Sequence, residues 1–132
     1  MVEFNLLAIA VVSILAFIAS MMWYLSFGKQ LSKLNPKAYG DMKRPKSKEM
    51  LLEILRNVIF AFVIGYFIRY LGVMTWVEGL RLGLAFWIGF PVIILSGSVL
   101  HEKVPIKLAA IHAGDWLIKI LLMTIILGVW HS

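Results

Sequence analysis

The sequence has no cysteine among its 132 residues and few charged side chains. The lack of cysteine excludes disulfides, thiol catalysis, iron–sulfur clusters and thiolate zinc sites. Charged residues make up 15% of the chain and apolar residues 61%, whereas soluble domains carry about 25% charged residues. A soluble domain of this length could not hide so much apolar surface, because small domains bury only part of what they have. The composition therefore indicates an integral membrane protein.

Several catalytic signatures are also missing. The sequence has no glycine-rich phosphate loop, and its histidines lack the spacing of a zincin site. Ser98 lacks the G-x-S-x-G spacing of glycines that marks a nucleophile elbow. We therefore expect no enzymatic activity, no cofactor and no metal site. An intramembrane dyad of Ser96 or Ser98 with His112 is the alternative that ranks last.

Four apolar segments follow one another along the chain. Because a helical span needs about 20 predominantly apolar residues, the sequence predicts an all-α protein with four transmembrane helices packed as a bundle. We expect residues 1–132 to form a single domain, with a tight turn at 72–77 and a short loop at 101–105. Pro91 interrupts the third segment, and proline removes a helical hydrogen bond, so we expect a kink near 87–91. The predicted spans are about 4–27, 48–71, 76–100 and 106–130.

The second span is the most polar at its start. Its charge-free stretch covers only residues 57–68, which at about 1.5 Å per residue is too short for a hydrocarbon core of about 30 Å. A full span must therefore draw Arg56 toward the membrane, and Glu53 can follow it.

Basic residues concentrate between the first two spans. The segment 28–49 carries seven of them, and the pairs Asn35-Pro36 and Arg44-Pro45 favour a loop. The alternative is a short amphipathic helix on the lipid surface at about 29–34. Because basic loops stay in the cytoplasm, we expect segment 28–49 to be cytoplasmic and both termini to lie outside a plasma membrane. The net charge of +6 thus reflects membrane orientation, and we expect no nucleic-acid partner.

Three ionisable residues in the fourth span form the clearest candidate site. His112, Asp115 and Lys119 are spaced by three and four residues and therefore share one helical face. An unpaired ammonium deep in a membrane is costly, so Asp115 is the expected partner of Lys119. The functional interpretation is a proton relay or an ion or substrate site. The structural interpretation is an ion pair that holds this helix to another.

Two further polar groups lie near the ends of the spans. Glu53, Arg56 and Asn57 share one face of the second span. They form either a self-neutralising pair at the cytoplasmic boundary or the cytoplasmic approach to Asp115. The outer group is expected to clamp spans two and three together, with an outer vestibule as the alternative. Its members are Arg69, Glu78 and Arg81.

Small residues spaced by four occur in two of the predicted spans. Gly79 and Gly83 form one such pair, and Ala16 and Ser20 form another. Such pairs let helices approach closely in lipid, and they fit either internal packing or self-association.

Short motifs along most of the chain resemble a known family. They include NLLAI at 5–9, WY at 23–24, FGK at 27–29, LGL at 82–84, WIGF at 87–90, HEK at 101–103, IHAGD at 111–115 and LGVW at 127–130. With these motifs the chain resembles the domain of unknown function 1761 family, which are small prokaryotic multi-pass membrane proteins. The resemblance implies a fold of four membrane helices and leaves the activity open.

The leading hypothesis is a small transporter or channel-like protein for a proton, an ion or a small solute. In it, His112, Asp115 and Lys119 form the central site and Glu53, Arg56 and Asn57 form the approach. Four helices are few for a complete path, so we expect a homo-oligomer. The alternative is a non-catalytic accessory subunit that docks in a larger membrane complex through its buried charges.

Overall fold

The computed structural model describes residues 4–39 and 46–130, and within these ranges the chain forms helices and no strands. Four helices are long and apolar enough to cross a membrane, which confirms the prediction of four long apolar helices. Three of them are α1 (Leu6–Ser26), α4 (Ser47–Tyr70) and α7 (Ile106–Val129). The other is the continuous helix Trp76–Glu102, which consists of α5 (Trp76–Trp87), η1 (Ile88–Val92) and α6 (Ile93–Glu102).

The basic segment is helical where the structure describes it, so the prediction of a loop is wrong for residues 28–39. The chain forms α2 (Gly28–Leu34) and α3 (Pro36–Tyr39), with Asn35 between them. Leu31 is buried against Leu108 and Ile111 of α7, and this apolar contact outweighs the weak helical tendency of so short a segment. The helix of the alternative interpretation is therefore present as α2, and its place on the lipid surface stays a prediction. The predicted break at Arg44-Pro45 lies outside the described residues.

Pro91 is accommodated without ending the third span. The five residues Ile88–Val92 form one π-helical turn around it. A π-turn shifts the hydrogen-bond register, so the missing N–H of proline interrupts the backbone ladder only locally. At the place of the predicted kink near 87–91 the structure has a π-turn, and the helix continues to Glu102. It ends at Lys103, whose φ of 57° is the left-handed conformation that stops many helices.

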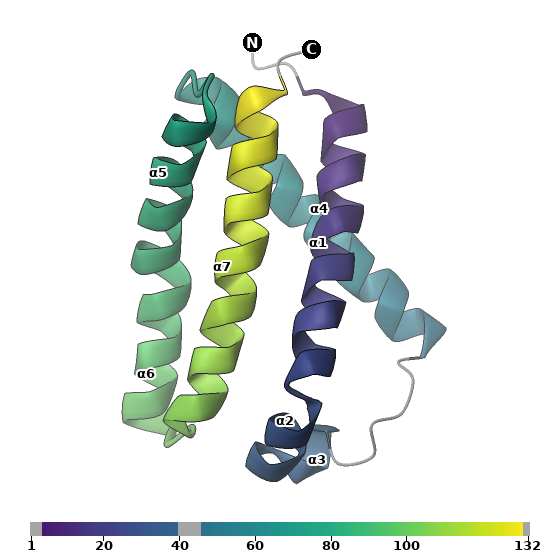
Figure 1. Cartoon of the computed structure of the whole chain (residues 1–132), viewed down its shortest axis with the longest axis vertical. Coiled ribbons are helices and arrows are strands. Elements are labelled where there is room, and N and C mark those ends of the chain that lie inside the picture. Colours follow the sequence, from purple (N-terminus) through teal and green to yellow (C-terminus); the bar gives the residue numbers. More distant parts are fainter. Residues whose placement is uncertain (1–3, 40–45, 131–132) are drawn as a thin grey trace.

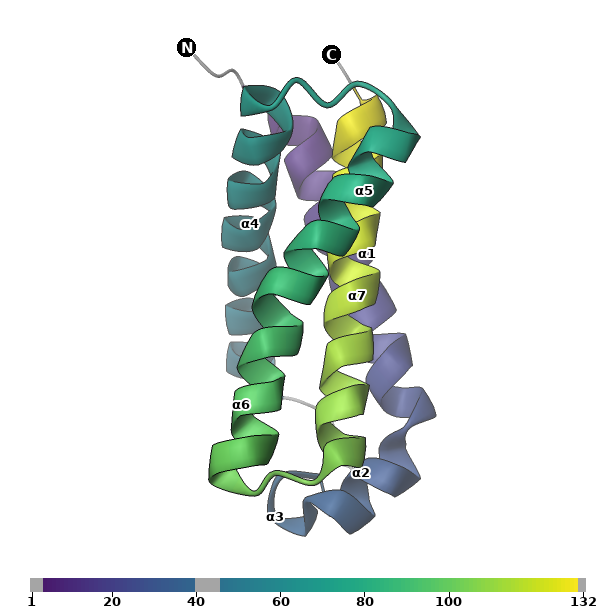
Figure 2. The same cartoon turned by 90° about the vertical axis from the view of Figure 1, so that its left-hand side faces the viewer.

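Helix α7 lies between the other long helices. It packs against α1, α4 and α5, and α1 also packs against α4. The start of α1 and the end of α7 lie at one end of the molecule, here called the terminal end (Figure 1). The opposite end, here called the loop end, holds α2, α3 and the connection from α6 to α7 (Figures 1 and 2).

The main apolar core lies in the half of the molecule nearer the terminal end. It is formed by small and branched side chains that α1, α4 and α7 turn toward one another. Toward the loop end α4 leaves the other helices, and its start stands away from α7 in both views (Figures 1 and 2). The core residues are Ala8, Ile9, Val12, Ala16, Ala61, Ile64, Ile68, Met123 and Leu127.

The glycine pair Gly79 and Gly83 serves internal packing. A Cβ at Gly79 would lie 2.5 Å from the backbone oxygen of Thr124, and a Cβ at Gly83 would lie 2.5 Å from the hydroxyl oxygen of Thr124. Neither contact can form without a shift, so only glycine lets α5 approach α7 this closely. The predicted close approach is therefore found within one chain.

We expect Gly79→Ala to destabilise the protein by about 1–3 kcal/mol, because the added methyl group meets backbone that cannot turn away. The free energy of unfolding, measured by SDS titration of the detergent-solubilised protein, tests this expectation. Gly97→Ala is the matched control, since nothing lies within 4 Å of a Cβ at Gly97. Equal stability of the two variants would contradict the packing described for Gly79.

Candidate functional site

Asp115 and Lys119 form an ion pair within the apolar part of α7. Lys119 Nζ lies 2.9 Å from Asp115 Oδ2, and the two residues are only 6% and 3% exposed. The Lys119 ammonium also lies 4.0 Å from the centre of the Trp116 ring, within cation–π distance. The predicted partnership is therefore present. Because both residues belong to one helix, however, the ion pair itself does not join α7 to a neighbour.

Helix α1 supplies the bonds that join the polar face of α7 to another helix. Ser20 Oγ donates a hydrogen bond to Asp115 Oδ1, and the Tyr24 hydroxyl lies 2.7 Å from His112 Nδ1. Ser20 and Tyr24 are four residues apart, as are many neighbours on one helical face. In the sequence, Ser20 stands out only as a small residue and Tyr24 only as part of the WY motif at 23–24. Their role depends on the register between α1 and α7, which neither segment reveals alone.

Two indole groups hold the same stretch of α7 from opposite neighbours. Trp23 Nε1 of α1 donates to the carbonyl of Ile111, and Trp87 Nε1 of α5 donates to the carbonyl of Ala113, each at 2.8 Å. Gly114 makes room for this arrangement, because a Cβ there would collide with the Trp23 ring. The position and rotation of α7 are thus fixed beside His112 and Asp115.

A pocket of about 830 Å³ opens between α1, α4 and α7 at the loop end. Its inner part is lined by the predicted central residues His112, Asp115 and Lys119, and its α4 side by the predicted approach residues Glu53, Arg56 and Asn57. The two predicted groups, which are more than fifty positions apart in the sequence, therefore share one cavity. The sequence suggested such proximity only from their common side of the membrane.

Asn57 is a buried residue of this pocket whose side chain is left without a hydrogen-bond partner among the residues that the structure describes. The residue is 5% exposed, and no described residue offers its carboxamide a hydrogen-bond partner. Every fully enclosed side-chain nitrogen and oxygen atom of the described residues does have a partner. The carboxamide of Asn57 is therefore reached from the pocket, and it is a donor and an acceptor available to whatever fills that space.

The mouth of the pocket is polar and partly exposed to solvent. Glu53 and Arg56 form an ion pair whose side chains are 41% and 66% exposed, so this pair contributes little to stability. Lys46 donates its backbone N–H to Glu49 at the start of α4. Burial raises the pKa of the Tyr39 phenol above its ordinary value of 10.0, and the charge of Asp115 raises it further. Tyr39 thus remains a neutral hydroxyl at the mouth.

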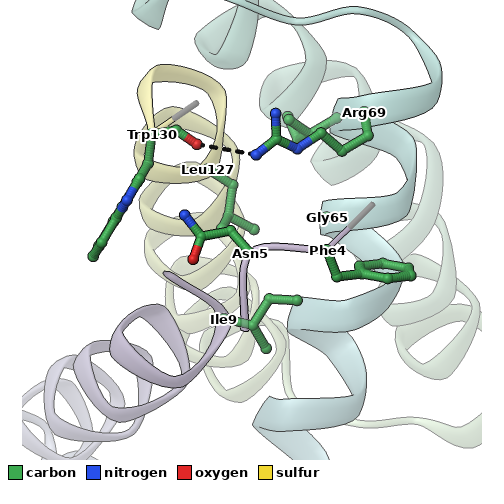
Figure 3. A pocket seen from close by; sticks show the side chains of 8 residues that line it. Phe4, Asn5, Ile9, Gly65, Arg69, Leu127 and Trp130 are labelled. Carbon is green, nitrogen blue, oxygen red and sulfur yellow. Dashed lines mark hydrogen bonds between the residues drawn. The ribbon is translucent and has the colours of Figure 1, made fainter. Parts of the chain in front are cut away.

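The outer residues Arg69, Glu78 and Arg81 bond to different groups. Arg69 Nη2 donates to the carbonyl of Trp130 at 3.4 Å (Figure 3). Glu78 Oε2 accepts from the backbone N–H of Met74 at 2.8 Å, which closes the turn before α5. Arg81 is exposed on α5, and no ion pair joins it to Glu78 within the described part of the chain. The expected clamp between spans two and three is thus replaced, at Glu78, by a local turn contact.

The terminal end is almost filled. A cavity of about 10 Å³ lies there among Phe4, Ile9, Gly65 and Leu127, beside Arg69 (Figure 3). Such a volume holds a single water molecule at most. The large pocket at the loop end and the closed terminal end therefore give the molecule one polar, accessible half and one tightly packed half.

The described residues offer no cluster of three or more His, Asp or Glu side chains that could hold a metal ion. Fold and site together define a small helical protein with four helices long and apolar enough to cross a membrane and an ionisable pocket between them. The chain belongs to the family of proteins of unknown function DUF1761, whose model matches residues 7–128. This match confirms the resemblance noted from the sequence. Searches of curated proteins and of solved structures give no match.

A double-mutant cycle tests the buried ion pair. Asp115→Asn or Lys119→Met alone leaves one charge buried without its partner, and we expect each to cost about 3–5 kcal/mol of unfolding free energy. The double variant leaves no charge, so its cost should be well below the sum of the two. SDS titration of the purified variants measures all three values.

The exposed pair provides the control for this cycle. Glu53→Gln and Arg56→Gln should each cost less than about 1 kcal/mol and combine additively, because solvent screens both charges. Additive costs at Asp115 and Lys119 as well would show that the buried pair is not energetically coupled.

Proposed function

We propose that this protein is a plasma-membrane transporter that binds a small solute or a proton in the pocket at the loop end. The observation that carries the proposal is the cavity of about 830 Å³ that reaches the ion pair of Asp115 and Lys119. Ionisable groups inside a membrane region that also face a cavity are a frequent mark of substrate and ion pathways. A purely structural ion pair would need no cavity beside it.

The loop end faces the cytoplasm in this proposal, and both termini lie outside. Basic residues near the ends of membrane helices favour the cytoplasmic side. The described basic residues in α2 and α3, at the start of α4 and around the connection from α6 to α7 are Lys29, Lys33, Lys37, Lys46, Lys48, Lys103 and Lys107. With the even number of spans, this orientation puts the mouth of the pocket in contact with the cytoplasm.

A transporter fits the shape of the molecule better than an open channel does. The apolar core around Val12, Ile64 and Met123 lies between the pocket and the terminal end, and the cavity at that end holds about 10 Å³. A channel needs a polar path through the whole membrane, whereas a transporter keeps one side closed while the other is open. The arrangement therefore corresponds to a state open to the cytoplasm.

The polar side chains have separate parts in this mechanism. Asp115 and Lys119 neutralise each other, so the empty pocket carries no net charge at its inner end. A solute or a proton that binds one of them changes this balance and loosens the bond from Ser20. Because that bond joins α1 to α7, occupancy of the pocket can influence the packing of the two helices.

Substituted cysteines test access to the pocket, because the natural chain contains none. We expect Asn57→Cys and Met21→Cys to react with a small, membrane-impermeant thiol reagent applied from the cytoplasmic side, since both positions line the pocket. Ile94→Cys is the control: its side chain is exposed on the apolar surface of α6 and should face lipid. Labelling of Asn57→Cys from the outside only, or from neither side, would contradict the proposed access.

Flux into liposomes tests transport itself. In vesicles with the reconstituted protein, we expect proton flux under an imposed membrane potential to fall to the level of empty vesicles in Asp115→Asn and in Lys119→Met. Arg81→Gln should leave the flux unchanged, because Arg81 is exposed and lies outside the pocket. The double variant Asp115→Asn/Lys119→Met leaves no unpaired charge and should therefore keep its fold. A loss of flux in this variant is then a loss of transport and not a loss of folding. Unchanged flux in all the pocket variants would exclude the proposed role of the ion pair.

A further inference from the structure

We infer that the pocket binds a monocarboxylate with an apolar body, that is, an amphipathic organic acid. The inference rests on the proposed function, since it names the class of solute that the same pocket would take. It follows from three properties of the lining: which hydrogen-bonding groups remain available, what net charge the lining carries, and where its apolar side chains lie.

The groups that remain available at the inner end are mainly donors. A lysine ammonium has three N–H groups, and Lys119 uses one of them for Asp115 at 2.9 Å. No described residue offers it a second hydrogen bond. The Asn57 carboxamide on the facing helix α4 adds two N–H groups, again without a partner. A ligand group with two acceptor oxygens could bridge these donors.

The carboxylate groups in the pocket, which are its charged acceptors, are already paired. Asp115 Oδ1 accepts from Ser20 and Oδ2 lies against Lys119, while Glu53 pairs with Arg56. A cationic solute would have to compete with these internal donors for both carboxylates. An anionic solute meets donors that have nothing else to bind, and hydrogen bonds to charged groups are the strong ones.

The charge of the lining matches a single negative charge. Four cationic and three anionic side chains line the pocket, which leaves one positive charge in excess. A monoanion neutralises this excess, whereas a phosphate dianion would leave a negative charge in a partly apolar site, where uncompensated charge is costly. A carboxylate is therefore favoured over a phosphate monoester. The charged residues are Lys37, Lys46, Arg56 and Lys119, and Glu49, Glu53 and Asp115.

One wall of the pocket is apolar. Phe17, Met21 and Leu25 of α1 all line it, and their spacing of four residues aligns them along one face of the helix. They extend from the level of Ser20 toward the mouth. A ligand whose carboxylate meets Lys119 and Asn57 would lay its apolar body against this wall. The volume of about 830 Å³ is within the range of sites for small organic ligands, about 300–1,000 Å³.

Calorimetric titration of the full-length protein in nanodiscs tests the inference, with empty nanodiscs subtracted to remove partitioning into lipid. The probes are octanoate, octanol and octylamine, which share an apolar chain and differ in the charge of the head group. We expect saturable binding of octanoate that is at least about tenfold tighter than binding of the other two, as the strength of charge-assisted hydrogen bonds implies.

Two variants examine the two donors separately. Asn57→Leu keeps the ion pair and should weaken octanoate binding by about tenfold through loss of one hydrogen bond to a charged group. The double variant Asp115→Asn/Lys119→Met removes the ammonium without leaving an unpaired carboxylate, and it should weaken binding at least as much. Arg81→Gln is the control and should bind octanoate like the unmodified protein.

The outcomes distinguish the ligand class from the proposed function. Equal binding of all three probes, or tighter binding of octylamine, would overturn the monocarboxylate while leaving the pocket as a solute site. Octanoate binding that neither variant changes would overturn the placement of the carboxylate. If no probe binds, the inference fails, and the cysteine labelling and the flux measurements then decide independently whether the pocket serves transport.

Discussion

The structure depends on the need to neutralise and hydrogen-bond two charges inside an apolar helix. Asp115 and Lys119 neutralise each other within α7. They lie one helical turn apart, and Lys119 Nζ is 2.9 Å from Asp115 Oδ2. The pair can therefore enter lipid with its own helix, before the other helices pack. The remaining hydrogen-bonding capacity of the carboxylate requires a partner from elsewhere, and Ser20 of α1 provides it. Folding is thus tied to the polar face of α7.

The surroundings of α7 follow from this requirement. Its polar face is turned toward α1 and the pocket, and another part of its surface meets the small residues of α5 at Gly79 and Gly83. The two indoles of Trp23 and Trp87 fix the intervening stretch from both neighbours. Close backbone packing against α5 and hydrogen bonds from both α1 and α5 leave α7 few alternative rotations.

The sequence predicts the parts of this structure that are encoded locally. Long apolar runs indicate the four spans, and ionisable residues at spacings of three and four within such a run indicate one polar face, as for His112, Asp115 and Lys119. The contributions of Ser20 and Tyr24 could not be predicted, because single polar residues in an apolar span are compatible with several orientations. Helix α2 was only the alternative to a loop for a related reason: Leu31 gains its burial from α7, about eighty positions later in the chain.

The position of the pocket has the same cause as the difficulty of inserting α4. In the half of α4 toward the terminal end, Ala61, Ile64 and Ile68 pack into the core. The half toward the loop end carries Glu49, Glu53 and Arg56, which could pack against α7 only if further charges compensated them. Since the charges of Asp115 and Lys119 already balance each other, the buried part of α7 offers no net charge to these residues, so this half of α4 stays apart and the space between the helices remains open. The charges that make the second span expensive in lipid are therefore the charges that keep the pocket accessible.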